Sequence, residues 1–244
     1  TSLLETKPTA VPAGFHLAEH FRPIISKTQY QAHIGRIQDY ILAGDCYQVN
    51  YAQRFEAALE GDAWSAYRYV RTLLAGDFSG FLRTAEDHTI LSLSPERFLR
   101  IHQGTVTSQP IKGTAPRHSD PEQDAALAKA LLNSEKDRAE NVMITDLLRN
   151  DLGQFCQTGS VNVTELCGLH SYNSVHHLVS TVEGKLAPGV SAGEMLLATS
   201  PGGSITGAPK KRAVEIIAEL EPAPRGAYCG SLFILGGDDW LQSS

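Results

Sequence analysis

Strand-forming segments follow one another without an intervening helical segment in the middle of this 244-residue chain. We predict strands at residues 78–83, 90–101 and 105–111. The second strand is expected to break at Ser94-Pro95-Glu96, because proline cannot continue a hydrogen-bonded ladder. Elsewhere hairpins and helices are interspersed. This mixed order predicts an α+β fold, a sandwich of antiparallel sheets with flanking helices, and not a doubly wound parallel sheet.

Periodicity and capping residues predict the remaining elements. A helix is expected to begin at Ser26-Lys27-Thr28 and to end near Gly44. Further helices are predicted at residues 63–74, from 119 through 131, and at 137–150, 192–199 and 209–220. Further strands are predicted at 46–55, with Gln48 and Asn50 on one face, at 160–166 and 176–183, and in a hairpin at 232–240.

Two regions are distinguished by these patterns. Residues 1–25 contain Pro8, Pro12, Gly14 and Pro23, and we expect a linker or the remnant of an N-terminal region. Residues 26–244 are expected to form one domain, incomplete at its C-terminus, because the final hairpin has barely begun its second strand. We therefore expect a fragment truncated at both ends.

The composition describes a globular protein and excludes several classes. Hydrophobic residues make up 42% and charged residues 20%, and the net charge of −6 has no basic patch typical of nucleic-acid binding. No apolar run approaches the roughly 20 residues of a membrane helix. The four cysteines form no C-x-x-C pair, which argues against zinc or disulfides and favours a reducing cytoplasm; they are Cys46, Cys156, Cys167 and Cys229.

Lys112 lies between an apolar run and a glycine turn, within residues 108–117. A lysine that enters a pocket there loses solvent, and desolvation favours the neutral amine, which can attack carbon. Lys112 is thus a candidate nucleophile. The alternative is an exposed lysine at a strand end, which is the commoner environment of this residue type.

Two carboxylates are candidates for related chemistry. Glu96 lies sixteen positions before Lys112, so a hairpin could bring the two together, with Glu96 as a general acid or in an ordinary ion pair. Glu140 lies beside an apolar stripe of the helix predicted at 137–150. It could bind a hard cation such as Mg²⁺, or form a surface salt bridge with Arg138 or Arg149.

Small residues crowd positions 200–211, which include Gly202, Gly203, Ser204 and Gly207. Free amides ahead of a helix can bind an anion, and a carboxylate is the expected guest. A Walker A loop is excluded, because Ala208 stands where that motif requires lysine. The alternative is a tight loop that joins two helices.

His176 and His177 begin an apolar strand, so alternation predicts that one of them points inward. A buried histidine that is hydrogen-bonded to a backbone partner is the commoner outcome for such a residue.

Six segments in order resemble motifs of the chorismate-utilising enzymes, the family that includes anthranilate synthase component I. They are 44–50 (GDCYQVN), 94–98 (SPERF), 110–114 (PIKGT), 137–141 (DRAEN), 177–180 (HLVS) and 201–210 (PGGSITGAPK). The similarity extends from about residue 26 to the end. It implies the chorismate-binding sandwich of antiparallel sheets with flanking helices, and an enzyme that acts on chorismate.

Two positions divide this family by its chemistry. Anthranilate-forming members have alanine where this chain has Lys112, and water-adding members have lysine where it has Gln48. The resemblance therefore implies the branch that makes 4-amino-4-deoxychorismate, for para-aminobenzoate and folate biosynthesis. Anthranilate formation is the runner-up.

The resemblance also implies a role for each candidate. Lys112 would attack C2 of chorismate as the 4-hydroxyl leaves, Glu96 would protonate that hydroxyl, and ammonia would then add at C4 and expel the lysine. Glu140 would help to hold Mg²⁺ against a substrate carboxylate, and His177 would lie near the reacting ring. Carboxylates of the substrate would be bound by residues of the two glycine-containing loops, namely Gly113, Thr114, Gly203 and Ser204.

A partner and two alternatives complete the expectations. Ammonia would come from a glutamine amidotransferase subunit, since the chain shows no glutaminase-like cysteine motif. In the family, a carboxylate-binding arginine and further magnesium ligands follow beyond Ser244, so we expect the isolated chain to be inactive or poorly folded. Alternatives from another class are a partner-binding module and a catalytically inactive fragment.

Overall fold

The computed structural model describes residues 14–74, 77–237 and 240–244. Its helices are α1 (Lys27–Leu42), α2 (Ala63–Leu74), α3 (Pro121–Leu132), α4 (Glu135–Gly153), α5 (Ala192–Thr199), α6 (Gly203–Thr206) and α7 (Lys210–Leu220). The strands before α3 are β1 (Phe15–Leu17), β2 (Arg22–Pro23), β3 (Gln48–Val49), β4 (Phe55–Glu56), β5 (Leu59–Gly61), β6 (Phe78–Ala85), β7 (His88–Ser94), β8 (Arg97–His102), β9 (Thr105–Gln109) and β10 (Ile111–Pro116). The later strands are β11 (Asn162–Ser171), β12 (Val175–Lys185), β13 (Gly207–Ala208), β14 (Phe233–Leu235) and β15 (Leu241–Ser243).

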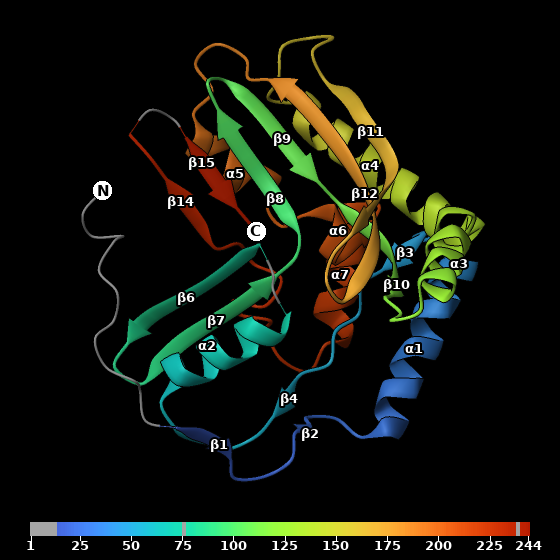
Figure 1. The fold of residues 1–244 in the computed structure, drawn as a ribbon. Coiled ribbons are helices and arrows are strands. Elements are labelled where there is room, and N and C mark those ends of the chain that lie inside the picture. The colour runs from blue at the N-terminus through green and yellow to red at the C-terminus, as the bar shows by residue number, and fades with distance from the viewer. Residues whose placement is uncertain (1–13, 75–76, 238–239) are drawn as a thin grey trace.

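One seven-stranded sheet organises the fold. Its strands are ordered β10-β12-β9-β8-β15-β14, and β11 pairs with the other edge of β12. Every pairing in this sheet is antiparallel. Helix α4 packs against β10, β11 and β12, while the separate β6–β7 hairpin carries α2 (Figure 1). The α+β class with antiparallel sheets and flanking helices is therefore confirmed.

The core lies between this sheet and helices α4 and α5. It contains buried residues of both layers, namely Leu99, Ile101, Val106, Ile144, Leu148, Leu152, Cys156, Val182, Leu186, Ala192, Met195, Leu196 and Leu241. Full burial of each large aliphatic side chain contributes roughly 1.5–3 kcal/mol. This layer gives the site residues on α4 and the sheet a rigid support.

Capping residues explain where the helices begin. The hydroxyl of Ser26 accepts from the amide of Gln29, and the Gln29 side chain accepts in return from the Ser26 amide. Helix α3 starts at Pro121, two residues after the predicted start at 119, because Asp120 is the N-cap and accepts from the amides of Glu122 and Gln123. The predicted helices at 63–74 and 192–199 are confirmed at both ends.

Several predicted strands differ from the structure. The segment 46–55 is not one strand: only β3 and β4 form, and β3 pairs with β13. Pro110 divides the strand predicted at 105–111 into β9 and β10, both of which pair with β12. Within the segment 1–25, β1 pairs with β5 and β2 with β4, whereas residues 1–13 lie outside the described residues.

Candidate active site

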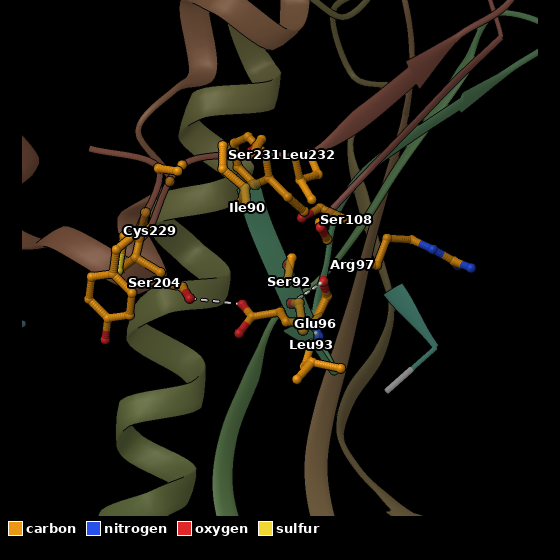
Figure 2. A pocket seen from close by; sticks show the side chains of 18 of the residues that line it. Ile90, Ser92, Leu93, Glu96, Arg97, Ser108, Ser204, Cys229, Ser231 and Leu232 are labelled. Atoms are coloured by element: carbon orange, nitrogen blue, oxygen red, sulfur yellow. Dashed lines mark hydrogen bonds between the residues drawn. The ribbon is translucent and has the colours of Figure 1, made fainter. Parts of the chain in front are cut away.

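Glu96 and Lys112 meet on a single residue of α6. The hydroxyl of Ser204 donates to Oε1 of Glu96 over 2.8 Å (Figure 2). The Nζ atom of Lys112 donates to the backbone carbonyl of Ser204 over 3.0 Å. Glu96 lies in the turn between β7 and β8, where Pro95 ends the ladder. The two candidate side chains are thus brought together, with Ser204 between them.

The environment of Glu96 suits a proton donor. Burial raises the pKa of this carboxyl group, because desolvation disfavours the charged form. The hydrogen bond from Ser204 and the charge of Lys112 lower the pKa, but they only partly offset the burial. Glu96 therefore keeps its proton at a higher pH than an exposed glutamate does, which general-acid chemistry requires.

Helix α6 is held tightly from two sides. A side chain at Gly203 would begin only 2.2 Å from Cδ2 of Leu147 on α4, so glycine is required for this close approach. On the opposite side, the carbonyl of Ile205 accepts from Asn50 over 3.0 Å and from Arg225 over 2.9 Å. These contacts fix the position of Ser204. The predicted helix at 209–220 begins at Lys210, so the anion site expected ahead of it is instead the separate short helix α6 and strand β13.

Gln48 faces Glu140 across the site. Its Nε2 donates to Oε1 of Glu140 over 3.0 Å, so the position that the sequence singled out contacts the candidate metal ligand on α4. The Oε1 atom of Gln48 is buried and has no hydrogen-bond partner among the described residues. Such an atom commonly marks a missing water or ion.

These oxygens fit Mg²⁺ in part. Magnesium is usually bound by one or two carboxylates, with water and substrate oxygens completing its octahedron. The Glu140 carboxylate beside the unpaired Oε1 of Gln48 suits that mode. No group of three His, Cys, Asp or Glu side chains in the described part of the chain could hold a metal by itself.

His177 is placed by the sheet register. Thr114 on β10 lies opposite His177 on β12, and the Thr114 hydroxyl is 2.9 Å from Nδ1 of His177. The Tyr172 ring packs edge-on against the imidazole, with centroids 5.7 Å apart. Burial lowers the pKa of His177, which favours the neutral ring.

Alternation predicted that one of the neighbouring histidines points inward, and the structure buries the other as well. Both are buried, with 3% exposure for His176 and 8% for His177. Strand β12 has neighbours on both edges, and helix α4 packs against it. Residues 176–182 of this strand are all buried, and their side chains alternate between its two faces, so both faces are covered.

A cavity of about 710 Å³ opens beside Glu96 (Figure 2). Its walls come from β7, α6 and the segment 227–232, and include Ser92, Ser108, Ser204, Cys229 and Leu232. Lys112 and His177 are not among its lining residues in the described part of the chain. Glu96, Gly203 and Ser204 therefore line the cavity directly, whereas Lys112 reaches the site through its contact with Ser204.

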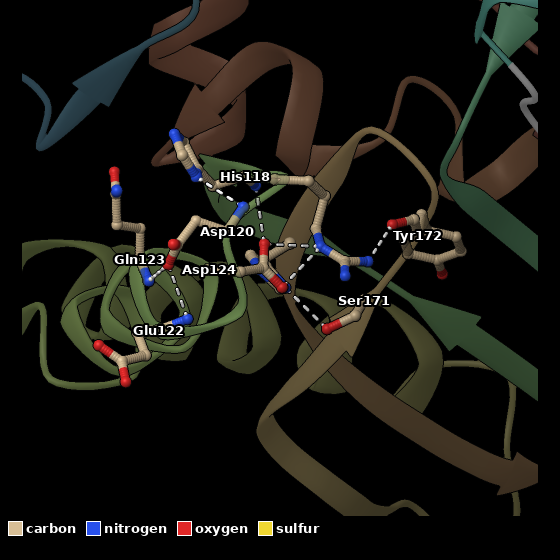
Figure 3. Close-up of polar contacts among 9 residues, drawn as sticks. His118, Asp120, Glu122, Gln123, Asp124, Ser171 and Tyr172 are labelled. Carbon is tan, nitrogen blue, oxygen red and sulfur yellow. Dashed lines mark hydrogen bonds and ion pairs between the residues drawn. The ribbon is translucent and has the colours of Figure 1, made fainter.

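A second polar cluster lies next to His177. The Asp124 carboxylate accepts from Arg117 and from the His118 amide over 2.9 and 2.8 Å, and its Oδ1 is 3.1 Å from Nε2 of His176 (Figure 3). Arg117 also donates to the Tyr172 carbonyl over 2.6 Å. This cluster holds the turn whose Tyr172 ring packs on His177. It gives no evidence of separate chemistry, because none of these residues lines the cavity.

Asn141 is a buried residue at the site that the sequence reasoning did not single out as functional. It has no exposed surface and contacts the backbone of Lys112. A signal for it exists in the sequence: Asn141 lies on the same helix face as Ile144, Thr145 and Leu148, by i, i+3, i+4 and i+7 spacing. An amide on an apolar face indicates a buried polar network.

The fold and these residues define an enzyme of the chorismate-binding class, and comparison of the sequence with known families agrees. Residues 2–244 match the family described as chorismate binding enzymes. The chain belongs to this family, and the resemblance inferred from the six motifs is confirmed.

Named relatives refine the comparison. Aminodeoxychorismate synthase component 1 of Klebsiella aerogenes is 51% identical over 241 residues, which are 99% of this chain and 53% of that protein. The protein of the same name from Escherichia coli K12 is 47% identical over 94% of this chain and 50% of its own length. The chain thus spans about half the length of these curated relatives.

A solved structure shares the fold. Anthranilate synthase component I from Streptococcus pneumoniae TIGR4 superimposes with a TM-score of 0.86 at 33% identity, covering all of this chain and 54% of the other. None of the helices in the described residues is long and apolar enough to span a membrane.

Proposed function

We propose that the protein carrying this chain converts chorismate and ammonia to 4-amino-4-deoxychorismate, as an aminodeoxychorismate synthase component 1. The observation that carries the proposal is the convergence of Lys112 and Glu96 on Ser204, at 3.0 and 2.8 Å. A nucleophile and an acid are thereby held on one support. The two relatives named for this activity, at 51% and 47% identity, support the same function.

The proposed reaction consists of two allylic displacements. The neutral amine of Lys112 forms a bond to C2 of chorismate, the ring double bond shifts, and the C4–oxygen bond breaks. Glu96 donates its proton to the departing oxygen, which leaves as water, because hydroxide is a poor leaving group. Ammonia then adds at C4, the double bond shifts back, and Lys112 leaves C2 as an amine. The Lys112 nitrogen keeps both its protons in the adduct and so leaves as the neutral amine, and the proton that ammonia loses at C4 returns to Glu96, so that chorismate and ammonia give the product and water.

Residues around Lys112 and Glu96 are proposed to bind and orient the substrate. The amides and hydroxyls of Gly113, Thr114, Gly203 and Ser204 are proposed to hold the substrate carboxylates. His177 is proposed to lie near the reacting ring, where its neutral imidazole can donate or accept one hydrogen bond.

Mg²⁺ is the proposed cofactor, with Glu140 as one ligand. When bound, the ion would neutralise a substrate carboxylate and orient the ring. Gln48 donates to Oε1 of Glu140 through its amide, and its own oxygen, which has no partner among the described residues, is available as an acceptor. Its neutral amide also leaves the site without a base for adding water at C2, which distinguishes the proposed reaction from isochorismate formation.

Ammonia is proposed to come from a glutamine amidotransferase subunit. The designation component 1 in the relatives' names agrees with a second subunit. The product would serve para-aminobenzoate and folate biosynthesis in the cytoplasm.

Product analysis tests the proposal. The longest natural chain that carries this sequence is incubated with chorismate, Mg²⁺ and an ammonium salt. The products are then separated and identified by mass spectrometry. We expect 4-amino-4-deoxychorismate. Anthranilate as the product would favour the runner-up function, which the fold shared with anthranilate synthase component I makes the natural competitor. Turnover that depends on glutamine after the amidotransferase is added would support the partner.

A further inference from the structure

A β-bulge lies in strand β10 at Lys112. Val179 and His177 of β12 pair with residues 111 and 114 of β10, so Lys112 and Gly113 together face the single residue Leu178. Two residues opposite one interrupt the ladder and turn the side chains of the bulged strand. The bulge therefore determines the direction in which the Lys112 side chain leaves the sheet, toward Ser204.

Helix α4 packs directly on this bulge. Gly113 has φ +96°, a conformation that L side chains rarely adopt. A Cβ atom there would lie 3.0 Å from Cβ of Asp137 on α4, and 3.2 and 3.3 Å from side-chain atoms of Leu178 and Leu131. The space between the bulge and the helix is thus closed, so α4 can supply hydrogen-bond partners to carbonyl groups at the bulge.

Asn141, one turn after Asp137, supplies those partners. Its Nδ2 donates to the carbonyl of Leu178 over 3.0 Å and to the carbonyl of Lys112 over 3.4 Å. These two carbonyls belong to facing strands at the point where the ladder is interrupted. One side-chain amide therefore joins both strands of the bulge to α4.

The orientation of the Asn141 side-chain amide is set by hydrogen bonds to its oxygen atom. Its Oδ1 accepts from the hydroxyl of Ser180 and from that of Thr145 over 3.3 Å, and Ser180 accepts from the Cys167 amide over 2.9 Å. Two hydroxyl donors on the oxygen leave the NH₂ group to point at the bulge. Asn141 is fully buried, so solvent cannot replace these bonds.

We propose that Asn141 is a positioning residue. By holding the bulge, it fixes the direction of the Lys112 side chain, which we call the aim of Lys112, so that the amine faces C2 of the substrate. Because Glu140 is the preceding residue of α4, the same contact also sets the spacing between Lys112 and the proposed metal ligand. The inference rests on the proposed function, since it concerns how the nucleophile of that reaction is directed.

Amine labelling tests the aim of Lys112 separately from turnover. Acetic anhydride is applied at one fixed pH to the full-length protein, and labelled peptides are quantified by mass spectrometry, with exposed Lys129 as the internal reference. The variants are Asn141→Asp, which puts a carboxylate oxygen against two carbonyls, and Asn141→Ser, which is too short to reach them. Thr145→Val is the matched control, because it removes a bond to Oδ1 but leaves both donors of Asn141 in place.

In both Asn141 variants, we expect the labelling rate of Lys112 relative to that of Lys129 to rise, because Lys112 is no longer held against the Ser204 carbonyl. We also expect kcat to fall about 10²-fold with KM for chorismate within about threefold, as expected for a misplaced reacting group. Thr145→Val should lower the melting temperature but keep the wild-type ratio of the two labelling rates.

An unchanged labelling rate of Lys112 relative to Lys129 in a folded Asn141 variant overturns the proposal, whatever happens to kcat. If Asn141→Asp does not fold, Asn141→Ser decides. A Lys112→Ala variant that keeps its turnover would instead contradict the proposed function, and the labelling comparison would still decide whether Asn141 aims the lysine.

Discussion

The hydroxyl of Ser204 donates to Oε1 of Glu96 over 2.8 Å, although the two residues are 108 positions apart in the sequence. A donor on a carboxylate stabilises its charged form, so this bond lowers the pKa of Glu96 against the larger effect of burial, which raises it. The balance between the two sets the pH range in which Glu96 carries a proton.

Ser204→Ala should therefore shift the pH dependence of the reaction. Loss of the donor raises the pKa of Glu96 further, so the acid stays protonated to higher pH. We expect the alkaline limb of kcat/KM to move upward in pH, measured from pH 5 to 10. Ser200→Ala is the control, because the Ser200 hydroxyl donates to the Leu196 carbonyl and not to Glu96. If the alkaline limb of kcat/KM stays at the same pH in Ser204→Ala, a group other than Glu96 controls that limb.

Glu96→Gln should remove the proton donor while keeping the shape of the side chain. We expect kcat to fall by about 10²–10⁴-fold, the usual contribution of a general acid. The alkaline limb should also disappear if Glu96 causes it. Activity close to wild type with ammonia as the amine source would exclude Glu96 as the acid.

The same substitution should alter stability in a pH-dependent way. Because burial raises the folded-state pKa of Glu96 above its ordinary value of 4.5, its contribution to stability is fully present below that pH. The contribution is lost as pH rises through the folded-state pKa. Glu96→Gln should lack this loss, so urea unfolding at several pH values should show the variant gaining on wild type as pH increases.

Lys112→Ala should abolish the proposed covalent route. We expect a loss of about 10³-fold or more in kcat, since the nucleophile is removed. Mass spectrometry of the wild-type protein with chorismate should show an adduct on Lys112, and exposed Lys129→Ala should retain both the adduct and the activity. The covalent mechanism fails if no adduct forms and Lys112→Ala remains fully active.

Glu140→Gln should weaken the binding of Mg²⁺. Replacing the charged ligand oxygen with an amide should raise the Mg²⁺ concentration for half-maximal activity at least about 10-fold. Chelation with EDTA should remove the activity of wild type reversibly. Glu135→Gln, at the exposed start of the same helix, is the matched control and should leave the magnesium dependence unchanged.

Asp124→Asn should destabilise the protein chiefly above pH 4. The Arg117 guanidinium, the His118 amide and the His176 ring hold the pKa of Asp124 well below its usual value. This contribution is present above the unfolded-state pKa and is lost as pH falls toward the folded-state pKa. Thermal melts from pH 3 to 7 should show the gap between wild type and variant narrowing on acidification. The control is Asp146→Asn, which removes an exposed ion pair with Arg149 on α4. Its melting temperature should stay close to that of wild type across this pH range.

Much of this protein follows from local sequence. Helix ends follow from capping residues such as Ser26 and from apolar periodicity, because these effects act within a few positions. The break at Pro95 and the six motifs are enough to locate Glu96, Lys112 and Glu140 as candidates. The structure of segment 46–55 could not be predicted in this way. Its residues favour a strand, but among the described residues ladder partners exist only for Gln48 and Val49 in β3 and for Phe55 in β4.

Long-range packing decided the rest. Lys112 and Ser204 are 92 positions apart, and only the path of the sheet and of α6 brings them into contact. The bulge at Lys112 depends on a register between β10 and β12, and both histidines of β12 are buried because neighbours cover both of its faces. Sequence thus determined which side chains were available for chemistry, since their identities and local elements are short-range properties. The tertiary structure alone decided which of them meet, because register and helix packing depend on residues far apart in the chain.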